Sequence, residues 1–178
     1  MKNIFYILVM SLLLSQCKKK DVYFLNVPDT GEPENVDIVI KNFTAEGYKN
    51  QSLNWSLKAD TSYIIYSDYK VEMEGIQMTY HENKNDTSVL TCESATMNRN
   101  TNDLNLKGNI EIKSSNGREL YTNILFWDNK KEELSTNLPV KIAYSDGEVI
   151  QGKGMKANGS LSKIVIYHPV GVHTIKNE

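Results

Sequence analysis

The sequence predicts an all-β domain that begins near residue 36, and three observations support this prediction. Apolar and polar residues alternate with a period of two, as in strands with one buried face; Leu53, Trp55, Leu57 and Ala59 form one such series. Clusters of Asn, Asp, Gly and Ser separate the runs at intervals of about 8 to 14 residues. After residue 35 we find no convincing amphipathic helix, and the best candidate, 94–100, is short. This rhythm is typical of a β-sandwich, barrel or solenoid.

The predicted strands follow one another with polar turns between them. In chain order they are 36–43, 53–59, 62–66, 69–73, 76–80, 88–93, 104–112, 119–127, 140–144, 148–151 and 161–167. His168 and Pro169 are expected to end the last strand. The first and last strands have no evident partner beyond them, so both are expected to lie at open sheet edges.

Two glycines interrupt the alternation. Gly75 separates the apolar series at 71–73 from the series at 76–80 and shifts its parity, which indicates a bulge or corner. Gly108 occupies an inward position between Leu106 and Ile110, where it is expected to leave room for another group.

The first 16 residues predict a lipoprotein-type signal peptide. Lys2 precedes an apolar run at 4–14, and Cys17 follows shortly after with three lysines behind it. The run is shorter than the roughly 20 apolar residues of a spanning helix. Cleavage before Cys17 would make this cysteine the lipid-bearing first residue. An uncleaved anchor and plain secretion remain as alternatives, and all three predict export.

A lipidated cysteine and flexible tether are predicted for 17–35, and the β domain for 36–178. Pro28, Gly31 and Pro33 disfavour helix and strand in the tether. The other cysteine, Cys92, lies in a strand-like run. If Cys17 is acylated, Cys92 has no disulfide partner, and we expect a buried, inert thiol.

Charge and residue types argue against nucleic-acid binding and catalysis. The net charge is −2 for the whole chain and becomes −3 without residues 1–16, whereas a nucleic-acid surface needs a basic excess. His81, His168 and His173 lack a second ligand at metal-binding spacing. No nucleophile elbow, glycine-rich phosphate loop or HExxH motif is present. We therefore expect no enzyme, no metal and no cofactor.

A set of short segments occurs in an order known from one family of envelope proteins. These segments are Phe43 with Trp-Ser-Leu-Lys-Ala at 55–59, Gly-Ile-Gln-Met-Thr-Tyr at 75–80, Leu-Thr-Cys-Glu-Ser-Ala at 90–95, Leu-Asn-Leu-Lys-Gly-Asn-Ile at 104–110, Gly-Arg-Glu-Leu-Tyr-Thr at 117–122, Leu-Phe-Trp-Asp at 125–128, 134–136, 139–140 and 150–155. Over about residues 38 to 167 the chain resembles the LptC family, the periplasmic membrane-attached component of lipopolysaccharide transport, and more broadly the OstA-like β domains. It departs from the family at Cys92, in place of the usual alanine, and at its lipoprotein-like N-terminus.

The resemblance implies a twisted, partly open β-jellyroll, a V-shaped pair of antiparallel sheets whose apolar inner face takes up lipopolysaccharide acyl chains. The strand edges would stack against an inner-membrane ABC exporter on one side and a periplasmic OstA-like protein on the other. A separate transporter would supply the work of ATP hydrolysis. The protein would sit at the periplasmic face of the cell envelope, held to the inner membrane through the lipid anchor at Cys17.

Apolar residues of the predicted inner face are the candidate groove lining. They are Trp55, Leu57, Ile76, Met78, Leu104, Leu106, Ile110 and Ile112, with Gly108 as a structural glycine. For any single one of them, an ordinary core position is the competing interpretation. The competing function is a surface or envelope lipoprotein whose β-sandwich binds a protein or host ligand through its loops. Such a sandwich should be tightly filled, whereas a conduit should carry a long open apolar groove.

The signal predicts that Cys17 carries the lipid. We expect the intact mass of the mature protein to show a lipid-modified N-terminus at Cys17. Cys17→Ala should release the domain into the soluble periplasmic fraction or leave an unprocessed precursor. An unmodified mature N-terminus would exclude the anchor.

Overall fold

The computed structural model describes residues 33, 35–83 and 86–174, and it confirms the all-β prediction. The predicted signal peptide, Cys17 and most of the predicted tether lie outside these residues. The described part contains ten strands. They are β1 (Ile38–Lys49), β2 (Ser52–Ile65), β3 (Lys70–His81), β4 (Thr87–Asn98), β5 (Leu104–Ser114), β6 (Arg118–Asp128), β7 (Glu133–Tyr144), β8 (Glu148–Asn158), β9 (Ile164–Ile166) and β10 (Pro169–Thr174).

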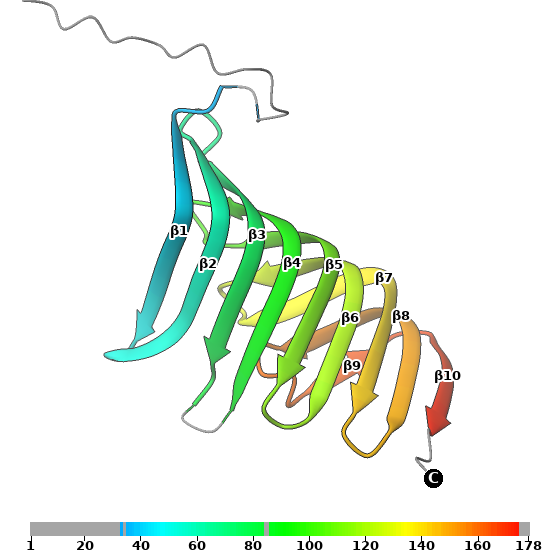
Figure 1. Ribbon diagram of the computed structural model, residues 1–178. Helices are drawn as coiled ribbons and strands as arrows, with labels where there is room; N and C mark the ends of the chain where they lie inside the picture. The colour runs from blue at the N-terminus through cyan, green and yellow to red at the C-terminus, as the bar shows by residue number, and fades with distance from the viewer. Residues whose placement is uncertain (1–32, 34, 84–85, 175–178) are drawn as a thin grey trace, which may run out of the picture. The chain divides into compact units, whose positions relative to one another are not determined.

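These strands form one open antiparallel sheet (Figure 1). From β1 to β8 each strand pairs with the next one along the chain. Beyond β8 the edge is shared, because β9 pairs with Met155–Ala157 and β10 pairs with residues 148–152. The edge strands β1 and β9/β10 do not pair with each other, so the sheet is not closed into a barrel. The partly open fold expected from the resemblance is therefore confirmed, with both arms of the V belonging to one continuous sheet.

The strands are longer than the sequence pattern predicted. The predicted strands 53–59 and 62–66 are halves of β2, and residues 94–98 of the short helix candidate belong to β4. In β2 the alternation continues through Thr61 and Tyr63, so the polar residues 60–62 resembled a turn although the strand does not end there. The strand predicted at 161–167 does end before His168, because β9 stops at Ile166, but a further strand, β10, begins at Pro169 and was not predicted. Proline is tolerated as the first residue of an edge strand.

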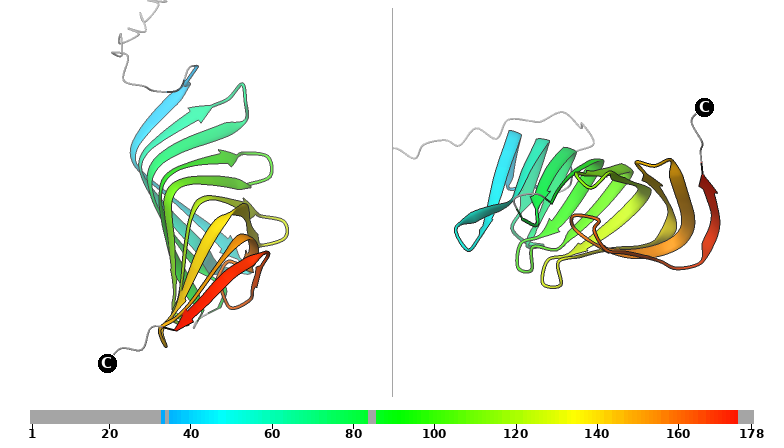
Figure 2. Two further views of the ribbon diagram at one scale, coloured as in Figure 1. Left: turned by 90° about the vertical axis from the view of Figure 1, so that its right-hand side faces the viewer. Right: turned by 90° about the horizontal axis from the view of Figure 1, so that it is seen from below.

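A line of irregular residues crosses the middle of the sheet and bends it. The pairing shifts between Thr91 and Ser94, between Lys107 and Ile110, and at matching points of β6 and β7. Left-handed backbone marks the same line at Gly75 (φ 62°) and Gly108 (φ 78°). The corner predicted at Gly75 is therefore confirmed, and Figure 2 shows the sheet turning there into two facing arms.

The corner line divides every long strand into two half-strands. The first arm consists of residues 38–41, 61–65, 70–74, 94–98, 104–107, 124–128, 133–136, 155–158 and 164–166. The second arm consists of residues 43–49, 52–59, 76–81, 87–92, 110–114, 118–122, 139–144, 148–153 and 169–174. Their inner faces meet in a single buried apolar cluster, so the core lies inside the V.

Side chains occupy the space beside the two corner glycines. A Cβ atom added to Gly108 would lie 2.8 Å from Cβ of Glu93, and a Cβ atom on Gly75 would meet the Asp60 carboxylate. The room left by Gly108 is thus taken by Glu93, whose carboxylate accepts a hydrogen bond from Asn109 Nδ2 at 2.5 Å. Only glycine combines the left-handed backbone with this close approach.

Gly108→Ala should lower the free energy of unfolding by about 1 to 3 kcal/mol, because alanine strains the left-handed backbone and meets Glu93. Urea unfolding measures the loss. The double variant Glu93→Ala/Gly108→Ala should regain only the part due to the Glu93 carboxylate, because alanine at position 93 keeps the Cβ atom that lies 2.8 Å away, with Glu93→Ala alone as the control. A neutral Gly108→Ala would contradict this account of the corner.

Candidate functional site

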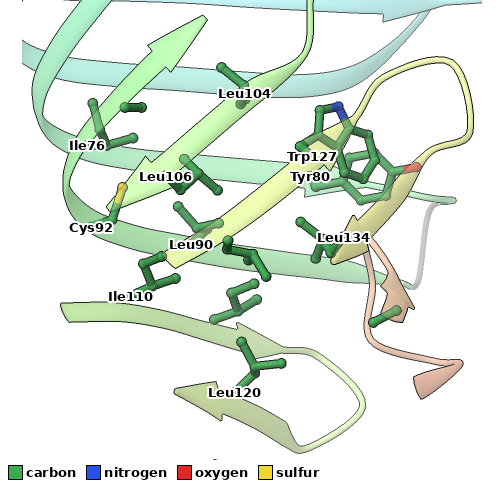
Figure 3. Close-up of a cluster of buried hydrophobic side chains, with 14 of the residues drawn as sticks. Ile76, Tyr80, Leu90, Cys92, Leu104, Leu106, Ile110, Leu120, Trp127 and Leu134 are labelled. Carbon is green, nitrogen blue, oxygen red and sulfur yellow. The ribbon is translucent and has the colours of Figure 1, made fainter. Parts of the chain in front are cut away.

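The interior of the V is the candidate functional site. All eight residues predicted for the groove lining lie there. Leu57, Ile76, Leu104, Leu106, Ile110 and Ile112 belong to the buried cluster, and Trp55 and Met78 are partly buried and pack against it. Figure 3 shows Ile76, Leu106 and Ile110 within this cluster beside Cys92. The period-two alternation therefore located one face of the sheet correctly.

Several interior residues were not among the predicted lining. Tyr80 of β3 and Trp127 of β6 meet inside the V with ring centroids 5.6 Å apart and an interplanar angle of 62° (Figure 3). This edge-to-face geometry is favourable for aromatic pairs. Tyr80 belongs to the second arm and Trp127 to the first, so the pair joins the facing arms. The sequence pattern could have identified Tyr80 and Trp127 as inner-face residues, because each of them continues a period-two apolar series.

The middle of the interior is filled by side chains. One small apolar cavity of about 30 Å³ remains there. Its lining is Met78, Tyr80, Ser88, Leu90, Leu104, Leu106, Ile112, Trp127, Leu134 and Gly159. This space holds about one water molecule, which is far less than an acyl chain requires. The long open groove expected of a conduit is thus not formed at this place, and the arms would have to separate to admit a lipid.

The apolar interior nevertheless reaches both edges of the sheet. Phe43 of β1 and Trp55 of β2 are partly buried against the core at one end. Ile164 and Ile166 of β9 are likewise partly buried against the core, at the other end of the sheet. A neighbouring sheet at either edge could therefore extend the apolar interior without a polar break.

Cys92 lies in this interior and is buried, as predicted. Its thiol donates to the carbonyl of Ser94 at 3.4 Å. Burial raises the pKa of the Cys92 thiol to about 11. The thiolate is the reactive form, so this cysteine is a poor nucleophile at neutral pH.

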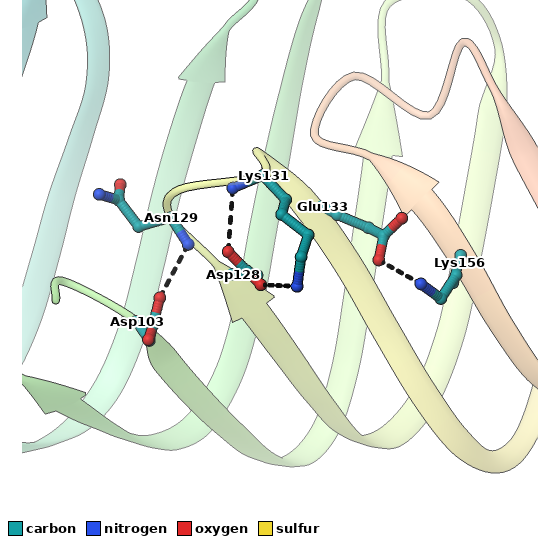
Figure 4. Close-up of polar contacts among 6 residues, drawn as sticks. All are labelled: Asp103, Asp128, Asn129, Lys131, Glu133 and Lys156. Carbon is teal, nitrogen blue, oxygen red and sulfur yellow. Dashed lines mark hydrogen bonds and ion pairs between the residues drawn. The ribbon is translucent and has the colours of Figure 1, made fainter.

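Charged groups lie on the outside, around the turns of the first arm (Figure 4). Asp128 accepts hydrogen bonds from Lys131 Nζ at 2.5 Å and from the Lys131 backbone at 2.9 Å. The bond from Lys131 Nζ holds the pKa of Asp128 below its usual value. Lys156 Nζ lies 2.7 Å from Glu133 Oε1 on the neighbouring strand. Exposed pairs of this kind stabilise a fold only weakly.

The described residues contain no group of three or more His, Cys, Asp or Glu side chains placed to hold a metal ion. His81 closes β3, and His168 lies between β9 and β10. Within the same described ranges, no helix is long and apolar enough to cross a membrane.

Comparison with known proteins agrees with this geometry. The family model for LptC, described as lipopolysaccharide-assembly, LptC-related, matches residues 4–174. A search of the curated proteins finds no match. The family match covers nearly the whole chain, including every strand of the sheet. The chain therefore belongs to the LptC family, whose members are periplasmic, inner-membrane-associated components of lipopolysaccharide export.

Proposed function

We propose that this protein is a bridge component of lipopolysaccharide export. It receives lipid from an inner-membrane ABC exporter into its apolar interior and passes it to a periplasmic OstA-like protein. The observation that carries this proposal is the apolar interior, which runs from one open sheet edge to the other. Family membership supports the lipid class.

The energetics of acyl chains explain why such an interior is needed. Moving an acyl chain into water costs about 0.8 kcal/mol per CH₂, or roughly 10 kcal/mol for about 12 carbons. An apolar path between two membranes removes most of this barrier. The eight interior residues predicted from the sequence would line that path, together with Tyr80, Leu90, Trp127 and Leu134.

The two open edges are the proposed docking surfaces. The outer edges of β1 and of β9/β10 present unpaired backbone groups, which allow another strand to add to the sheet. Val39 of β1 is 43% exposed and Val170 of β10 is 79% exposed, so both are accessible to a partner. Following the family, the β1 edge would face the transporter and the β9/β10 edge the next OstA-like protein.

The N-terminal segment would complete this arrangement. A lipid on Cys17 would hold the protein to the inner membrane, and the tether that ends near residue 35 would let the domain reach its neighbours. The domain would need no cofactor, and ATP hydrolysis would occur in the exporter.

One observation favours a second function. The filled centre of the V is what a ligand-binding sandwich should have, as in an envelope lipoprotein that binds a protein or host ligand through its loops. Lipid capture in cells separates the two functions.

A photo-crosslinking residue at Trp55 or Met78 should capture lipopolysaccharide in cells with an active exporter. Both side chains are only partly buried, so a bulky crosslinker disturbs the core less there than at Leu106. Lys58 and Gln77 are the matched controls, because they are exposed on the same two strands. Equal capture, or no capture, at inner and control positions would favour the loop-binding lipoprotein.

The two sheet edges should contact different proteins. Crosslinkers at Val39 and Val170 are expected to capture an exporter subunit and the OstA-like protein, respectively. Crosslinked bands are identified by mass spectrometry. The same partner at both positions, or none at either, would count against edge stacking.

A further inference from the structure

The loop that joins β8 to β9, residues 159–163, bridges the two arms. It lies at the tip of the first arm, and the carbonyl groups of its first three residues accept hydrogen bonds from the second arm. Ser88 Oγ donates to the Gly159 carbonyl at 2.6 Å, Ser114 Oγ donates to the Ser160 carbonyl at 2.6 Å, and Arg118 donates to the Leu161 carbonyl at 2.5 Å.

The Asn116 amide adds a further donor, at 3.2 Å from the Ser160 carbonyl. A carboxylate from the second arm holds the loop from another direction. Glu82 accepts hydrogen bonds from the Asn158 amide at 2.8 Å and from the Ser160 hydroxyl. We call residues 158–161 the clasp. We call Ser88, Ser114, Asn116 and Arg118 the donor set.

Residues 159–161 of the clasp are buried although they belong to a loop. Ser160 and Leu161 are both 0% exposed, and the Leu161 side chain joins the apolar core. Leu161 also has left-handed backbone, with φ at 57°, which is unfavourable for a branched side chain. Strain of this kind persists only where surrounding contacts enforce it, and it is frequent in segments that switch.

Side chains, rather than strand pairing, keep the facing arms together at this place. In the described sheet, strand pairing joins only neighbours in the strand order. In the part of the chain that the structure describes, the Tyr80–Trp127 contact and an exposed ion pair between Lys49 and Glu132 also cross the mouth. Exposed ion pairs contribute little. The clasp supplies buried polar contacts to this closure, whereas the Lys49–Glu132 pair is exposed.

The clasp also covers the central cavity. Gly159 and Ser88, which are bonded to each other, both line it beside Tyr80 and Trp127. Withdrawal of the loop would remove Leu161 from the core and open this cavity at the mouth of the V. It would also release the donor set from the loop carbonyls, with Ser114 Oγ keeping a weaker acceptor at the Thr87 carbonyl, 3.4 Å away.

We propose that the clasp is releasable and that its carbonyl groups occupy a binding site for a lipid. After release, the donor set would bind oxygen acceptors of an acylated lipid, such as phosphate or ester carbonyl groups, while an acyl chain takes the place of Leu161. The donor set suits this ligand, because all four members donate to oxygen in the closed state and Arg118 carries a positive charge. This inference rests on the proposed function, and its test separates the two.

Alkylation of Cys92 reports opening of the arms independently of lipid capture. The thiol lies in the closed interior, so N-ethylmaleimide reaches it only when the arms part. In membranes containing the full chain, Glu82→Ala/Ser160→Ala should raise the Cys92 alkylation rate about tenfold or more, because two cross-arm hydrogen bonds are lost. Peptide mass spectrometry measures the rate. Glu133→Ala is the matched control, since it removes an ion pair within the first arm, and it should change the rate less than about twofold.

A covalent lock tests lipid entry. In a Cys92→Ala background, Glu82→Cys/Ser160→Cys is joined by a short bis-maleimide, and capture of lipopolysaccharide from a crosslinker at Met78 is measured. Capture should fall at least about fivefold relative to Lys107→Cys/Ile124→Cys. That control pair joins opposed, exposed residues within the first arm. Arg118→Gln should also reduce capture without slowing Cys92 alkylation.

The outcomes are distinct. Unchanged Cys92 alkylation in the Glu82→Ala/Ser160→Ala variant overturns the clasp, whatever the lipid result. Faster alkylation with equal capture from locked and control proteins overturns the lipid site, because lipid then enters elsewhere. Faster alkylation together with no lipid capture by the unlocked protein would contradict both the proposed function and the lipid site. The clasp would then control only the opening of the arms.

Discussion

The corner across the middle of the sheet is the constraint on which the rest of the structure depends. A flat sheet of this length would expose one apolar face to water, and it has no second sheet to cover that face. The left-handed glycines of β3 and β5, with Asp60 and Glu93 lying over them, and the register shifts in the neighbouring strands form one bend, at which the sheet covers itself. The same bend leaves both edges unpaired, because the sheet folds across its strands instead of closing around them. The buried core and the two unpaired edges therefore have one cause, the bend of the sheet.

The sequence predicted the fold well because both of its main signals are local. Period-two alternation identified the inner face, and Gly75 identified the corner. Strand length was missed because the parity change at Gly75 in β3 and the polar residues 60–62 in β2 both resemble turns in a one-dimensional pattern. The continuation at Pro169 was missed because a proline that starts an edge strand has the same appearance as a terminator.

The candidate site was predictable only in part, because local alternation identifies a face of a strand but not which distant residues meet across the fold. The eight predicted residues lie on the inner face because alternation identifies one face of a strand, and their role as a groove lining stays a prediction. The aromatic pair of Tyr80 and Trp127 was not selected, although both residues continue such a series, because the meeting of β3 with β6 depends on the fold of the whole sheet. The clasp could not be predicted at all. Glu82 and Ser160 are 78 positions apart, and the pattern around each indicates only a polar turn.

The closed state of the interior also follows from the free-energy cost of exposing apolar surface to the surrounding water. Separating the arms would expose apolar surface to water, which costs about 25 cal/mol of free energy for each Å² exposed. An empty open groove is therefore unfavourable. The arms should therefore close on each other whenever no lipid lies between them, and a filled centre is compatible with a conduit whose closed form is its resting form. Side-chain hydrogen bonds are suited to hold such a form, because water or lipid oxygen atoms can replace them at little net cost. Strand pairing across the mouth would close the V permanently, and the described sheet places its pairing only between neighbours in the strand order.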